Sequence, residues 1–199
     1  SDPRASVLFL NRVPFLGGAE RVLLASMRAA TTRGLRPILA CPGGGRLQEA
    51  AESEGFRVFP SGFSRMKSAT NPLTLAGYAT SVLMEGRRLE RLCRQQEVCV
   101  IHAHGPVAAL YALRAAKRLR LPLLTHVHEA ARPKRSYVTA TRCVAPSTTR
   151  FLCVSNAVQR RLLDDVGIEK GRTQVVYNAV DPVFLSDVPV APAAVSGPG

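Results

Sequence analysis

Short apolar runs alternate with stretches of helical spacing from residue 7 to residue 177. Between most of these runs, apolar residues recur at intervals of three and four, as at Leu110, Leu113 and Ala116. The runs lack clean apolar–polar alternation, which is typical of strands buried on both faces. The pattern therefore predicts an α/β fold, with a parallel sheet of about seven strands and helices on both faces. The predicted strands are residues 7–10, 37–40, 57–59, 98–103, 121–127, 151–154 and 174–177.

At 199 residues the chain is long enough for one well-buried domain and short for two. We expect this domain to span residues 6–184, after a start at residues 1–5 that is a tag remnant or disordered. Residues 185–199 are predicted to be an interdomain linker, because the tail is mostly Pro, Ala, Gly and Val. Residues 61–72 and 130–149 interrupt the rhythm and are predicted to be long loops, where ligands of open α/β sheets usually bind.

The formal net charge of +13 suits an anionic partner: nucleic acid, an anionic membrane face or a phosphorylated substrate. Nucleic acid is disfavoured, because the basic residues are not interleaved with aromatic side chains that could stack on bases. The five cysteines contain no close pair with zinc-like spacing, so we expect buried, reduced thiols. Since no apolar run is long enough to span a bilayer and no signal peptide opens the chain, we expect the domain to fold in the cytoplasm.

Two adjacent glycines, Gly17 and Gly18, lie between the first predicted strand and the first helical pattern. Glycines at such a turn let the backbone approach a ligand closely, and the amides of the first helical turn attract anions. A phosphate or diphosphate is the natural ligand of this turn. The glycines could equally serve the turn alone, with Glu20 suiting the helix dipole.

All four histidines fall at the ends of two consecutive predicted strands, at residues 102 and 104 and at residues 126 and 128. Consecutive ends of a parallel sheet project into the same crevice, so His104 and His128 are expected to converge on one ligand. His102 and His126 are expected to point away from the crevice as core histidines. Zinc chelation by the His-X-His pairs, with Glu129 as a further ligand, is the alternative.

Five motifs occur in an order typical of one family. Together they resemble the N-terminal half of a family 4 (group 1) retaining glycosyltransferase, over nearly everything from residue 7 to residue 184. The resemblance implies the GT-B fold, in which two Rossmann-like domains face each other across a cleft. It makes residues 6–184 an acceptor-binding domain and places most of the nucleotide-sugar site in a C-terminal domain absent from this chain. The five motifs are residues 17–21, 102–104, 126–129, 154–158 and 177–181.

The resemblance also implies roles for individual residues. Gly17 and Gly18 match the turn that approaches the donor diphosphate, and His128 matches the catalytic histidine that lies against the transferred sugar. Asn178 and Asp181 match the interdomain hinge, although Ala179 replaces the usual glycine between them. The reaction needs no cofactor, and no metal is expected. The implied acceptor contacts are Glu20, Lys67, His104, Glu129 and Arg132, with Arg65 and Lys134 as looser candidates.

The resulting expectation is a retaining sugar transferase whose fragment alone is inactive. Its partners would be a nucleotide-sugar donor and an acceptor that is a sugar, a lipid-linked molecule or a phosphorylated small molecule. It would be cytoplasmic, with peripheral attachment to the inner membrane face also consistent with the charge. The alternative is a stand-alone membrane-associated binding module, or accessory subunit, that recruits a separate catalytic chain. A dinucleotide-dependent oxidoreductase is disfavoured, because Gly-X-Gly-X-X-Gly is missing and Cys41 stands where an acidic residue should close the second strand.

Overall fold

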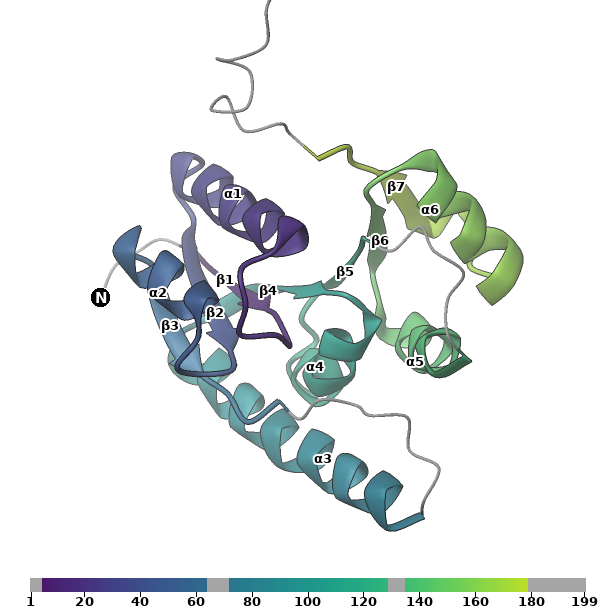
Figure 1. Cartoon of the computed structure of the whole chain (residues 1–199), viewed down its shortest axis with the longest axis horizontal. Coiled ribbons are helices and arrows are strands. Elements are labelled where there is room, and N and C mark those ends of the chain that lie inside the picture. The colour runs from purple at the N-terminus through teal and green to yellow at the C-terminus, as the bar shows by residue number, and fades with distance from the viewer. Residues whose placement is uncertain (1–4, 64–71, 129–134, 179–199) are drawn as a thin grey trace, which may run out of the picture.

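The computed structural model describes residues 5–63, 72–128 and 135–178, which form an α/β domain (Figure 1). Its seven strands pair in parallel, as the sequence predicted, and their order in the sheet is β3-β2-β1-β4-β5-β6-β7. The strands are β1 Ser6–Leu10, β2 Arg36–Cys41, β3 Arg57–Pro60, β4 Val98–His104, β5 Leu123–Val127, β6 Arg150–Cys153 and β7 Thr173–Val175. The α-helices are α1 Gly18–Thr32, α2 Arg46–Ser53, α3 Pro72–Gln95, α4 Pro106–Leu119, α5 Arg135–Val144 and α6 Asn156–Arg161.

The order of the strands reverses at β1, which pairs with β2 on one side and with β4 on the other. After β1 the chain first builds outward through β2 and β3, and it then returns through α3 to β4 on the opposite side of β1. In open α/β sheets the loops that follow such strands diverge at this reversal and leave a crevice between them, where ligands bind.

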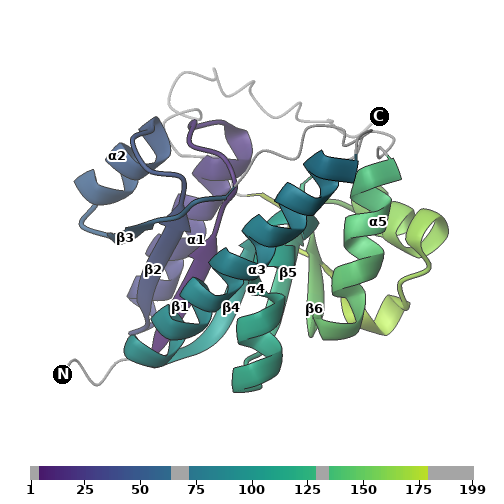
Figure 2. The same cartoon turned by 90° about the horizontal axis from the view of Figure 1, so that it is seen from below.

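Each face of the sheet carries its own core. Val7 and Phe9 face α1 and α2, whose Leu23, Met27 and Leu47 are fully buried against them. The opposite face packs against α3, α4, α5 and α6, where Tyr111 and Phe151 are the largest fully buried side chains. Figure 2 shows α3, α4 and α5 in front of the sheet and α1 behind it. The prediction of helices on both faces is thus confirmed.

The prediction of a long loop at residues 130–149 is wrong, because α5 and a short 3-10 turn at Ala145–Ser147 lie within it. The buried positions of α5 are Ala140, Thr141 and Val144, which share one narrow face. A stripe that contains threonine and alanine gives a weak apolar signal, even though its spacing of three and four is helical. The other predicted loop, residues 61–72, falls mostly outside the described residues, and Pro72 begins α3.

The cysteines are all unpaired, but only part of the expectation of burial holds. Cys41, Cys93 and Cys153 are buried, whereas Cys99 and Cys143 are exposed. In the described part of the chain, no helix combines the length and apolar character needed to cross a membrane.

Candidate active site

The crevice at the strand reversal is bounded by the β1–α1 loop on one side and by the ends of β4 and β5 on the other. Gly105 is the N-cap residue between β4 and α4 and has a φ of 93°, a backbone conformation that strongly favours glycine. Its amide donates to the carbonyl oxygen of His126 over 2.8 Å, and Pro106 then opens the helix. This turn stops β4 at His104 and ties it to β5.

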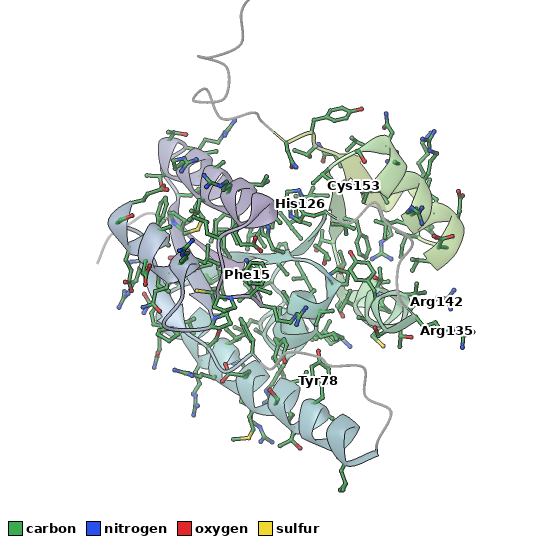
Figure 3. The ribbon with its side chains drawn as sticks, viewed as in Figure 1. Phe15, Tyr78, His126, Arg135, Arg142 and Cys153 are labelled. Atoms are coloured by element: carbon green, nitrogen blue, oxygen red, sulfur yellow. The ribbon has the colours of Figure 1, made fainter. Side chains whose placement is uncertain are left out.

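The four histidines form one cluster on the side of the sheet that carries α1, the side on which Figure 3 shows His126. Residues two apart in a strand share a face, and His104 pairs directly with His126 across β4 and β5. The ring centroids of His104 lie 5.0 Å from those of His102, His126 and His128. The expectation that His102 and His126 point away from the crevice residues is therefore wrong, since each lies one layer deeper on the same face.

His104 and His128 meet at the mouth of this cluster, as the sequence predicted. His128 Nε2 lies 3.0 Å from His104 Nδ1, which is a hydrogen bond whose donor depends on the tautomers. The ring of Phe9 closes the cluster at its inner end, 5.0 Å from the ring of His102. The array thus runs from the core of the sheet to the crevice.

Burial holds these imidazoles in their neutral form. It lowers the pKa of His102 from 6.5 to about 4 and that of His126 to about 3, with neighbouring histidines adding to the effect. The pKa of His104 is lowered well below 6.5 for the same reasons. Burial also lowers the pKa of His128, but the nearby carboxylate of Glu20 acts in the opposite direction.

Glu20 is an acidic group beside the crevice among the described residues, and it is only 6% exposed. Its Oε1 accepts a hydrogen bond from Asn11 Nδ2 over 3.1 Å, and its Oε2 accepts one from the Gly17 amide over 3.0 Å. The carboxylate therefore fixes the end of β1 to the start of α1. Sequence reasoning missed Asn11, although a buried polar residue directly after an apolar strand is a usable signal.

We expect Glu20→Gln to lower the free energy of unfolding by about 1–3 kcal/mol at pH 7, measured by urea denaturation. A carboxylate accepts from both Asn11 and Gly17, whereas a glutamine amide accepts from one and turns its NH2 donor toward the other. Glu49→Gln is the matched control, because Glu49 is an exposed acid in the first turn of α2. If both variants lose the same free energy of unfolding, Glu20 stabilises the chain only through the dipole of α1 and not through its two hydrogen bonds.

The β1–α1 loop also rests on the start of α2. The Leu47 amide donates to the Pro14 carbonyl oxygen over 3.0 Å. A Cβ at Gly45 would collide with backbone and side-chain atoms of Pro14, so this contact depends on glycine. A Cβ at Gly18, by contrast, would meet no atom within 4 Å, which leaves the exposed Gly18 open to a ligand.

A second hollow lies between the end of β3 and α3, and its lining includes Phe59, Ser61 and Leu89. Ser61 Oγ and Glu85 Oε2 are buried there without a hydrogen-bond partner among the described residues. Arg88 and Arg91 also contribute to its lining. This hollow adjoins residues 61–63, the described start of the first predicted loop.

Of the predicted hinge residues, the structure describes Asn178, which is exposed just after β7. In the motif at residues 154–158, Ser155 caps α6 by accepting from the Val158 amide over 3.3 Å. Several other predicted site residues lie outside the described residues: Lys67, Glu129, Arg132 and Asp181, together with Arg65, Lys134 and Ala179.

The strand order defines a Rossmann-like domain, and the glycine turn and the histidines lie at its switch point, where ligands of such sheets usually bind. Residues 16–184 match the glycosyltransferase family 4 domain, Glyco_transf_4, so the chain belongs to glycosyltransferase family 4. It corresponds to the N-terminal domain of these GT-B enzymes. No significant match was found among curated protein sequences.

Solved structures share the fold. HepE from Anabaena, in complex with UDP and glucose, is 21% identical with a TM-score of 0.67, over 89% of this chain and 45% of that one. A glycosyltransferase from Rickettsia africae is 17% identical with a TM-score of 0.71, over 94% and 47%. The lipopolysaccharide outer core galactosyltransferase WaaB is 16% identical with a TM-score of 0.66, over 88% and 46%. The chain thus spans about half the length of these proteins.

Proposed function

We propose that this chain is the acceptor-side half of a retaining glycosyltransferase that moves a sugar from a nucleotide-sugar donor to an acceptor. The observation that carries the proposal is the pairing of His104 and His128 at the mouth of the crevice, opposite Glu20 and the Gly17–Gly18 turn. Because His128 Nε2 is already engaged by His104, a neutral His128 offers its Nδ1 to a sugar hydroxyl. Its lowered pKa makes it an orienting group rather than a cation.

The donor would reach this domain with its diphosphate and sugar. HepE was solved with UDP and with UDP-glucose, which supports a uridine nucleotide sugar as the first donor to test. The Gly18 amide belongs to the first turn of α1 and has no Cβ in front of it, which suits a phosphate oxygen. Because Glu20 already accepts from the Gly17 amide, a diphosphate is expected beside Gly18 rather than against Gly17.

The acceptor would lie on the other side of the crevice, toward the hollow between β3 and α3. Its arginines suit an anionic group, and its unpartnered Ser61 and Glu85 oxygens suit hydroxyl groups. A phosphorylated or lipid-linked sugar combines these features. The net charge of +13 would favour such an acceptor, including one at an anionic membrane surface.

The proposal is tested by measuring which ligands raise the melting temperature of the 199-residue chain, since a ligand that prefers the folded state stabilises it. We expect a phosphorylated acceptor sugar to raise it, and Arg88→Ala with Arg91→Ala to abolish that shift. If UDP-glucose alone raises the melting temperature strongly, most of the donor site lies in this domain, which contradicts its assignment as the acceptor-side half. Sugar transfer by this chain alone would contradict the proposed dependence on residues outside it.

A further inference from the structure

Buried ring nitrogens without partners distinguish the inner part of the histidine cluster. His102 Nε2, His104 Nε2 and both ring nitrogens of His126 are buried and have no hydrogen-bond partner among the described residues. The three side chains are 8%, 8% and 3% exposed. A buried polar atom left unpaired costs free energy, so four of them in one place require an explanation.

The three histidine side chains also lie close enough to share a ligand. One ring nitrogen from each of the three histidines lies within 4.8 Å of the others. Ring packing alone does not explain the clustered nitrogens. An apolar ring such as that of Phe9 fills the same face of the sheet without burying an unpaired polar atom. We propose that His102, His104 and His126 bind one divalent transition-metal ion, for which Zn²⁺ is the best fit. This site goes beyond the proposed sugar transfer and would form whether or not that proposal holds.

The hydrogen bond between His104 and His128 supports this assignment. If His104 Nδ1 donates to His128 Nε2, the lone pair of His104 Nε2 is free and that nitrogen is left without another partner. Metal-bound histidines characteristically make such a bond with their second nitrogen, which fixes the tautomer. His128 would then be the outer partner of His104 rather than a ligand, and its own Nδ1 would keep a proton that can face the crevice.

Zinc binds the neutral form of imidazole through the lone pair of one ring nitrogen. Bonds of about 2.0–2.1 Å to a tetrahedral ion bring the nitrogens about 3.4 Å apart, so the rings would rotate inward slightly on binding. Three imidazoles leave a fourth position for water.

The ion would lie one layer beneath His128, between β4 and β5, and would therefore be separate from the reacting sugar. Its effect would be mechanical, since it would cross-link the ends of two strands and hold His104 under His128. The expectation that sugar transfer itself needs no metal is unaffected by this placement.

The experiment is a titration of the chelator-treated 199-residue chain with Co²⁺, followed by visible absorption, and then displacement with Zn²⁺. The exposed thiols are first removed as Cys99→Ser and Cys143→Ser, so that they do not bind metal themselves. We expect saturation at one ion per chain, absorption bands of four-coordinate cobalt, and a higher melting temperature that a chelator reverses. These readouts need no nucleotide sugar, so a failure of the metal site and a failure of the proposed function are distinguishable.

Variants assign the ligands. His126→Phe and His102→Phe keep an aromatic ring in the cluster and are each expected to weaken binding more than the 10- to 100-fold typical of losing an outer partner, whereas His128→Ala should show about that smaller loss. Leu152→Val is the matched control, because Leu152 pairs with His126 on the same face of the sheet and offers no ligand. The proposal is overturned if Co²⁺ does not saturate the wild-type cluster, or if both phenylalanine variants bind as tightly as the parent chain.

Discussion

The metal-free chain is expected to lose stability steeply as the pH falls from about 6.5 toward 4. His102 and His126 have their pKa values lowered by burial to about 4 and about 3, and His104 is also lowered well below 6.5. In the unfolded chain these side chains return to a pKa near 6.5 and take up protons first. Because the unfolded state binds more protons throughout this interval, protonation favours unfolding.

The size of the effect follows from the number of histidines. Near pH 5.5 three unfolded imidazoles are mostly protonated while their native counterparts are neutral, which gives a slope of about 4 kcal/mol per pH unit. Above about pH 7.5 both states are neutral at these positions, so the stability is at its plateau. A domain with a total stability of roughly 5–15 kcal/mol would therefore unfold in mildly acidic solution.

The measurement is urea denaturation of the chelator-treated chain at intervals between pH 7.5 and 5. All four histidines of the chain belong to the cluster, and carboxylates titrate mainly below this range, so the slope reports the cluster. His102→Phe combined with His126→Phe should remove about two thirds of the slope. A stability that stays flat across this range would show that the native cluster is already protonated or open to water.

The second large effect concerns His128. In the full-length enzyme that the proposed function implies, His128→Ala is expected to lower kcat by about 100- to 1000-fold, as does the loss of one positioned hydrogen-bonding group at a reacting centre. KM for the donor should change little, because the proposed function places most contacts to the nucleotide outside this domain. This split separates a group that acts on the reacting sugar from one that only binds the donor.

Two variants control the His128 experiment. His128→Gln keeps a side chain that can donate and accept near the same position and should recover part of the lost kcat. Thr139→Ala removes an exposed hydroxyl on α5 that bonds only the carbonyl oxygen of Arg135, at 3.0 Å, and should leave kcat unchanged. If His128→Ala retains the wild-type kcat, His128 does not contact the transferred sugar.

The sequence was sufficient for the sheet because apolar β-rich runs carry a strong local signal. All seven predicted strands match within two residues at each end, and the largest differences are the start of β5 at Leu123 rather than 121 and the end of β7 at Val175 rather than 177. The convergence of His104 and His128 could also be predicted, since it follows from consecutive strand ends. The inner pair was misplaced, because apolar neighbours of His102 and His126 suggested the core while the two-residue period places each on the face of its partner.

Two other features give only a weak signal in the local sequence. α5 was missed because its buried face is built from small and polar residues, including Thr141, whose hydroxyl bonds the Tyr137 carbonyl oxygen over 2.8 Å. The partnership of Asn11 with Glu20 joins a strand end to a helix start nine residues later. The residue types alone do not predict this hydrogen bond, because it depends on the conformation of the whole β1–α1 loop.

The close packing of Pro14 against Gly45 affects how this crevice would bind a ligand. The β1–α1 loop is held by the Leu47 amide at Pro14 and by the Glu20 carboxylate at Gly17 and Asn11. The loop therefore loses its conformational entropy when the chain folds, and ligand binding does not have to order it. Ligands should accordingly bind with little ordering cost at this loop, and variants that loosen it, such as Gly45→Ala, should weaken binding without removing any ligand contact.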